Sequence, residues 1–127
     1  METEQLQIYK DTFLIAKDLL MRQRHVSRLI KYGEYANAVS LTLEAMDYAY
    51  TASVSAAERQ WALTRYLICI GGVRSRIRLF GETKFITPDA QTHLMRMIDN
   101  VKRQAIGWRK TSQRQSREVN DDAGVLS

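Results

Sequence analysis

The apolar positions of this chain repeat with the period of an α-helix over most of its length. In the first 24 residues, apolar side chains three or four positions apart fall on one side of a helix: Leu6, Tyr9, Phe13, Ala16 and Leu20. We therefore expect a first helix over about residues 3–24, with this side facing the core. A second helix is expected over about 34–52, with these core positions: Ala38, Leu41, Ala45 or Met46, and Ala49.

Capping signals predict where two further helices begin and end. Ser55 and Glu58 have the spacing of a capping box, so a third helix is expected over about 55–80. Gly81 would end it as a left-handed C-terminal residue. Thr87 followed by Pro88 is typical of a helix start, which predicts a fourth helix over about 87–111.

The scarcity of helix breakers supports an all-α fold in one domain. The chain of 127 residues has one proline and six glycines, and four amphipathic helices with short connections predict an up-down-up-down four-helix bundle. Residues 112–127 are polar and lack periodicity, so we expect a disordered tail there.

Several features argue for a cytoplasmic setting. The single cysteine, Cys69, excludes an intramolecular disulfide and is expected to be an inert core residue. The acidic start lacks the basic and apolar regions of a secretory signal. The longest apolar or glycine run, residues 66–73, is far shorter than the roughly 20 residues of a membrane helix. We expect a cytoplasmic protein, with no membrane contact.

The third predicted helix has apolar residues on two sides. One side would face the core: Leu63, Tyr66, Leu67, Ile70, Val73, Ile77 and Phe80. The opposite side carries Trp61, Ile68, Gly72 and Leu79. Exposed contiguous apolar surface tends to mark contact sites, so this second side predicts a subunit interface. The alternatives are that the fourth helix or the tail covers it, or that the helix is wrongly phased.

Positive charge is concentrated in the second half of the chain. Residues 61–117 hold 12 basic and 3 acidic side chains, whereas the last ten residues hold 3 acidic and no basic ones. On the fourth helix, one side would face the core: Leu94, Met97, Ile98, Val101, Ala105 and Trp108. The opposite side is basic and carries Arg96, Arg103, Lys110 and Arg114, with Lys102 and Arg109 on its flank. Arg74, Arg76 and Arg78 of the third helix add to it. This basic surface predicts binding of phosphate backbones, of RNA or DNA, with a merely solvated face as the alternative.

No arrangement of residues suggests catalysis. The two histidines, His25 and His93, form no metal-binding motif, and Gly71-Gly72 falls inside a helix rather than in a phosphate-binding loop. We expect neither enzymatic activity, nor a metal site, nor a cofactor.

The order and spacing of several short segments resemble a known family of four-helix bundle proteins. The segment Leu6–Lys10, with Phe13 and Leu19-Leu20, is similar to the family's first helix, and Lys31–Glu34 to its entry into the second. Two more segments resemble its second and third helices: residues 43–50 and 65–67. The family includes the proteins encoded in intervening sequences of bacterial ribosomal RNA genes and the accessory variability determinant (Avd) proteins of diversity-generating retroelements. The ending Ile106–Lys110 resembles the close of the fourth helix in Avd.

The resemblance to Avd, over about residues 5–111, implies a function. It implies a homopentameric, barrel-like assembly, encoded by a prokaryote or phage, that binds the element's reverse transcriptase and template RNA in support of mutagenic complementary-DNA synthesis. The matching basic positions are Arg74, Arg78, Arg96, Arg103, Arg109 and Lys110. Gly33 without a preceding leucine and the acidic C-terminal segment depart from the family pattern. The alternative is a bundle of the ribosomal-RNA intervening-sequence type, or a helical adaptor, acting through protein contacts.

Overall fold

The structure is a computed structural model that describes the backbone of residues 3–126 and the side chains of residues 7–118. Five helices make up this part of the chain: α1 (Thr3–Gln23), α2 (Arg28–Lys31), α3 (Glu34–Val54), α4 (Arg59–Glu82) and α5 (Pro88–Leu126). No strand occurs in it, which confirms the predicted all-α class. None of the helices in the described residues is both long and apolar enough to cross a membrane.

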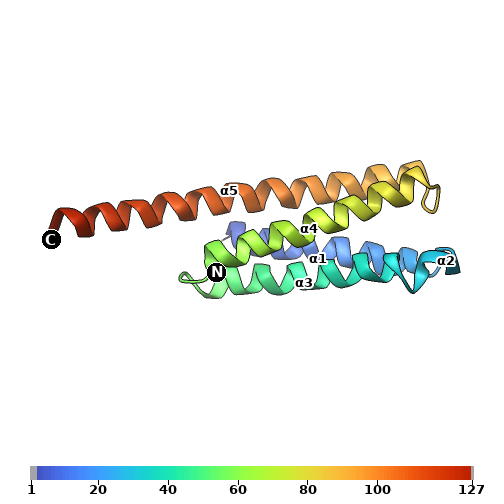
Figure 1. Cartoon of the computed structure of the whole chain (residues 1–127), viewed down its shortest axis with the longest axis horizontal. Coiled ribbons are helices and arrows are strands. Elements are labelled where there is room, and N and C mark those ends of the chain that lie inside the picture. The colour runs from blue at the N-terminus through green and yellow to red at the C-terminus, as the bar shows by residue number, and fades with distance from the viewer. Residues whose placement is uncertain (1–2, 127) are drawn as a thin grey trace.

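The four long helices run antiparallel in succession, and the short α2 forms part of the connection between α1 and α3 (Figure 1). Neighbouring pairs are α1 with α3, α3 with α4, α4 with α5, and α5 with α1. Helices α1 and α4 therefore lie at opposite corners of the bundle, as do α3 and α5. The C-terminal part of α5 extends past the loop that joins α3 to α4 (Figure 1).

The predicted helix starts are confirmed at α5 and in part at α4. The Thr87 hydroxyl accepts a hydrogen bond of 3.1 Å from the backbone N–H of Ala90, and Pro88 is the first helical residue. The Ser55 hydroxyl likewise accepts from the N–H of Glu58 at 3.2 Å. However, residues 56–58 form a turn, so the α-helix begins only at Arg59.

The predicted end of the third helix at Gly81 is wrong. Helix α4 continues to Glu82, and the left-handed residue is Lys84, with φ of 65°. The N–H of Phe85 then bonds to the carbonyl of Phe80 at 2.9 Å, which closes the helix end two residues later than expected. Gly81 instead faces α5, where an added Cβ would lie 2.1 Å from the side-chain oxygen of Gln91.

The prediction of a disordered tail from residue 112 is also wrong for the backbone described, because α5 continues to Leu126. The segment has no proline, and its only glycine is Gly124, so nothing in it interrupts a helix that is already formed. Ser112 is still buried against the bundle, and Gln60 of α4 donates a 3.1 Å hydrogen bond to Ser116.

The core confirms the predicted phases of α4 and α5. Helix α4 buries six of its predicted core side chains: Leu63, Tyr66, Ile70, Val73, Ile77 and Phe80. Helix α5 buries four: Leu94, Ile98, Val101 and Ala105. Leu67, Met97 and Trp108 are partly buried at the margin of the core. On α3, the core is mostly alanine (Ala38, Ala45 and Ala49), which lets α3 and α4 pack closely.

The predicted phase of the first helix is wrong. The side chains that α1 buries are those of Ile8, Thr12, Ile15, Ala16 and Leu19. Of the predicted core positions only Ala16 is buried, while Tyr9, Phe13 and Leu20 are exposed, and the side chain of Leu6 lies outside the described ones. Because α1 is apolar on two sides, its periodicity alone could not distinguish them.

Candidate nucleic-acid interface

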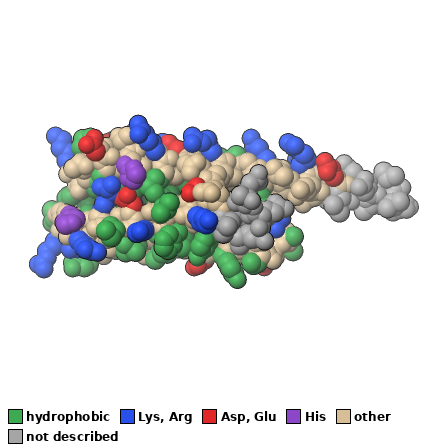
Figure 2. All heavy atoms as spheres, turned by 180° about the vertical axis from the view of Figure 1, so that it is seen from behind, with side chains coloured by type: hydrophobic (Ala, Val, Ile, Leu, Met, Phe, Trp, Pro, Cys, Tyr) green, Lys and Arg blue, Asp and Glu red, His purple; other side chains and the backbone are tan. Residues whose placement is uncertain are grey.

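Helix α5 carries a line of exposed cationic side chains, which we call the α5 ridge: Arg96, Lys102, Arg103, Lys110 and Arg114. Seven residues, or two helical turns, separate Arg96, Arg103 and Lys110, which places them on one side of the helix. Figure 2 shows the molecule from the side opposite to that of Figure 1, with basic side chains spaced along the outer edge of α5. The core side of α5 fixes this orientation, because its buried residues lie on the opposite side of the helix.

The described side chains leave the cations of the α5 ridge without ion pairs. Within the described side chains, residues 7–118, none of its five cations has a carboxylate at salt-bridge distance. A solvated helix face normally mixes signs and forms i,i+4 pairs. Within this part of the chain, no carboxylate therefore competes with a negatively charged ligand for the ridge cations.

The three arginines of α4 have a different environment. Each donates from Nε to a carboxylate: Arg74 to Asp99 at 3.0 Å, Arg76 to Glu34 at 3.1 Å and Arg78 to Glu82 at 3.0 Å. These pairs link α4 to α5 and to α3, or stay within α4. The nine predicted cations thus separate into the α5 ridge, the paired α4 arginines and Arg109.

Arg109 extends toward α4 rather than along the ridge. It is partly buried, its Nη1 donates a 3.4 Å hydrogen bond to the hydroxyl of Thr64, and its buried Nε has no hydrogen-bond partner among the described residues. Beside it, the guanidinium of Arg59 lies 5.5 Å from the ring centroid of Trp108. Arg109 consequently contributes more to α4–α5 packing than to the outer surface.

The predicted second apolar side of α4 is exposed. Trp61, Ile68 and Leu79 are 53%, 62% and 52% exposed, so neither α5 nor another described segment covers them. The Trp61 ring meets Tyr48 of α3 edge-on at 5.6 Å between centroids, and Gly72 lies close to Leu41. We call the three exposed side chains the α4 stripe.

A second exposed apolar surface lies between α1 and α3, and sequence analysis missed it. A groove between α1 and α3 is lined by Phe13, Leu20, Met21, Leu43 and Met46, which are exposed or partly buried. We call this the α1 groove. The sequence carries a signal for it, since α1 is apolar on two sides, but the periodicity of Phe13 and Leu20 predicts the outer side as the core.

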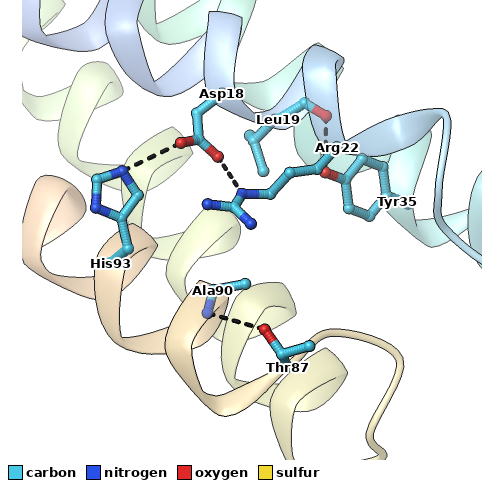
Figure 3. A network of polar contacts seen from close by, with 7 residues as sticks. All are labelled: Asp18, Leu19, Arg22, Tyr35, Thr87, Ala90 and His93. Carbon is cyan, nitrogen blue, oxygen red and sulfur yellow. Dashed lines mark hydrogen bonds and ion pairs between the residues drawn. The ribbon is translucent and has the colours of Figure 1, made fainter.

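Polar contacts link α1 to α5 (Figure 3). The Asp18 carboxylate lies between Arg22, one turn later on α1, and His93 of α5, whose Nε2 is 3.1 Å from Asp18 Oδ2. Sequence analysis singled out His93 but found no partner for it. No group of histidine, cysteine and acidic side chains in the described part of the chain could hold a metal ion.

Cys69 is buried on α4, as predicted, with 6% of its surface exposed. Burial, together with the nearby carboxylate of Glu44, raises the pKa of its thiol. A raised pKa lowers the thiolate fraction and hence the reactivity of the sulfur, which fits a core residue.

These features define a helical bundle with two exposed apolar surfaces and, among the described side chains, one basic edge without ion pairs. Comparison with protein-family models, curated proteins and solved structures finds no match.

Proposed function

We propose that this chain is a non-catalytic accessory subunit that binds nucleic acid along the α5 ridge and assembles into a symmetric oligomer. The observation that carries the proposal is that no carboxylate among the described side chains lies within salt-bridge distance of a ridge cation. From Arg96 to Lys110 the ridge extends for roughly 21 Å at 1.5 Å per residue.

The chemistry of the ridge suits phosphate rather than bases. Arginine presents a planar fork of donors to phosphate oxygens, and each phosphate neutralised releases counterions, so binding weakens steeply with salt. Contacts of this kind fix position on the strand but carry no sequence information.

The positions of the two apolar surfaces support a closed ring. The stripe lies on α4, whereas the groove lies between α1 and α3, so each would meet a neighbouring subunit of its own. A contact between two different surfaces is heterologous and closes into a ring when the rotation permits. Because α5 is a separate corner between α1 and α4, the ridge would stay exposed in that ring.

The resemblance to Avd makes the proposal more specific. We propose a homopentameric barrel that associates with a retroelement reverse transcriptase and its template RNA and supports mutagenic complementary-DNA synthesis in a prokaryotic or phage-infected cytoplasm. The Gly107-Trp108-Arg109-Lys110 segment and the basic α5 are the features of this chain that support it.

The ridge is tested by measuring retention of the element's template RNA at 50 and 200 mM salt. We expect Arg96→Glu/Arg103→Glu/Lys110→Glu to bind far more weakly, with a slope of log affinity against log salt shallower by about 2. Reversing three exposed cations away from the ridge and from both apolar surfaces (Lys10, Arg28 and Lys84) changes the net charge equally and provides the control. Equal binding by wild type and the ridge variant would remove the proposal.

The exposed α4 stripe favours a second candidate function. A helical adaptor, or a bundle of the ribosomal-RNA intervening-sequence type, would use Trp61, Ile68 and Leu79 to bind other proteins, with the ridge incidental. Neighbouring genes distinguish the two candidates: a reverse transcriptase with template and variable repeats favours the first, and a ribosomal RNA gene favours the second.

A further inference from the structure

Beside the α5 ridge, a recess of about 460 Å³ opens between the start of α1 and the middle of α5. Its walls combine amide, guanidinium and aromatic groups: Gln7 of α1, and Arg103, Gln104 and Trp108 of α5. Arg103 belongs to both the ridge and the recess. A strand whose phosphate contacts Arg103 would therefore have its base next to this opening.

Asp11 fixes the orientation of the two glutamine side chains in the recess. Gln7 Nε2 donates to Asp11 Oδ1 at 2.8 Å, and Gln104 Nε2 donates to Asp11 Oδ2 at 2.7 Å. Since a carboxylate only accepts hydrogen bonds, both amides must turn their NH₂ groups to it. Their carbonyl oxygens accept no hydrogen bond from the described residues, so they remain available as acceptors.

Gly107 keeps the α5 wall of the recess open. A Cβ added there would meet no atom within 4 Å, so the space is not occupied by a neighbouring described side chain. The wall also offers donors, from the Arg103 guanidinium, next to the glutamine acceptors. Mixed donors and acceptors beside an aromatic ring are what the edge and face of a nucleobase require.

We propose that this recess holds one unpaired nucleobase, preferably one with an exocyclic amino group, from a single strand whose phosphates lie on the α5 ridge. The inference rests on the proposed function, because the ridge must first hold the strand. It adds that the preferred ligand is single-stranded nucleic acid.

The recess and the ridge make opposite predictions for duplexes. Phosphate contacts alone favour a duplex, which has the higher charge density and the larger counterion release. A base held in a Watson–Crick pair cannot enter a recess on the protein surface. A preference for single strands consequently reports on the recess and not on the ridge.

The test compares the affinity of the full chain for a fluorescent 16-nucleotide RNA of mixed sequence and for the matching duplex. We expect wild type to bind the single strand about tenfold more tightly. Gly107→Leu fills the recess and should abolish this preference while leaving duplex affinity within about twofold of wild type. Gly107→Ala, which adds only a Cβ where there is room for one, is the matched control and should keep the preference.

Each alternative outcome has a distinct meaning. If wild type binds the duplex as tightly as the single strand, or more tightly, the recess proposal is overturned and the ridge proposal stands. The same holds if Gly107→Leu, at unchanged helix content, loses equal affinity for both ligands. If wild type binds neither ligand, the proposed function fails and this inference fails with it.

A second comparison tests the choice of base. The free glutamine oxygens should accept from the amino group of cytosine, whereas uracil presents a carbonyl at the same position. We expect oligo(C) to bind about threefold more tightly than oligo(U), and Gln104→Leu to remove the difference. Equal binding of the two by wild type would overturn the amino-group preference.

Discussion

Asp99 lies among the cations of α5, and its Oδ1 accepts a 3.0 Å charge-assisted hydrogen bond from Nε of Arg74 on α4. The one carboxylate that interrupts the basic side of α5 is thus itself paired. The pairing also explains why Arg74, although basic, does not add a free cation to the α5 ridge.

Asp99→Asn should strengthen nucleic-acid binding. The substitution removes a negative charge from the basic side and releases Arg74 to contact a phosphate. We expect affinity to rise a few-fold and the salt slope to steepen by up to about 0.7, the value for one added phosphate contact on a single strand. Fluorescence anisotropy of a labelled oligonucleotide across 50–200 mM salt measures both.

The control for this change is Asp47→Asn, which alters the net charge equally at an exposed position of α3. The Arg74–Asp99 pair is about 40% exposed on both sides, so its loss should cost at most about 1 kcal/mol of stability. Identical binding by the two variants would show that the position of the charge on α5 is irrelevant.

Trp61→Glu should reduce the mass of the particle in solution. It places a charge in the middle of an apolar contact, where Trp61 is 53% exposed in the single chain and would be buried in the oligomer. Sedimentation velocity at micromolar concentration should find wild type as an oligomer and Trp61→Glu as a smaller species.

Gln113→Glu is the matched control, because it adds one negative charge at an exposed position of α5 away from the α4 stripe. It should leave the mass unchanged. A monomeric wild type, unaffected by Trp61→Glu, would reject the subunit interface, whereas the ridge would remain a candidate site.

Periodicity could predict the helices, and for α4 and α5 also their buried sides. The α4 core positions are correct because its second apolar side holds fewer apolar residues, and those of α5 because charge marks its outer side unambiguously. The inner side of α1 could not be found in the same way, since Phe13 and Leu20 repeat with the same period as Ile15 and Leu19. Tertiary packing alone decides between them.

The ion pairs of the basic surface could not be predicted from local sequence. Arg74 and Asp99 are 25 residues apart, and Arg76 and Glu34 are 42 apart, so only the helix arrangement brings them together. The recess beside Gly107 depends on the same arrangement, because its two walls come from α1 and α5. The end of α5 was missed for a different reason: apolar periodicity stops near residue 111, but the helix does not need it to continue.

Asp11→Ala should weaken the contact between α1 and α5. The Asp11 carboxylate accepts hydrogen bonds from Gln7 and from two α5 side chains, Asn100 and Gln104. Its removal leaves two partly buried donors, Asn100 and Gln104, and the exposed Gln7 without this acceptor, which should cost about 1–3 kcal/mol. Thermal unfolding monitored by circular dichroism measures the loss. A melting temperature equal to that of wild type would show that these hydrogen bonds are replaced by water at no cost.

A buried hydroxyl pair joins the two corners of the bundle that are otherwise not neighbours. Thr12 Oγ1 donates to the carbonyl of Ile8, so the 2.6 Å contact between Thr12 and Tyr66 must have the Tyr66 hydroxyl as its donor. Tyr66→Phe removes this donor and should destabilise the fold by about 1 kcal/mol, which lowers the melting temperature by about 3–5 °C.

The same pair makes stability sensitive to alkaline pH. Burial raises the pKa of Tyr66 above its ordinary value of 10.0, despite the opposing effect of the Thr12 hydrogen bond. Above that pH the unfolded chain loses the phenolic proton while the folded chain retains it, so the folded state binds more protons and the free energy of unfolding falls as pH rises. Urea unfolding of wild type between pH 9 and 11 should show this decline, and Tyr66→Phe should show a smaller one. Tyr35, whose pKa burial also raises, remains in the variant and should maintain part of the decline. Parallel curves for wild type and variant would mean that Tyr66 ionises in the folded bundle as readily as in water.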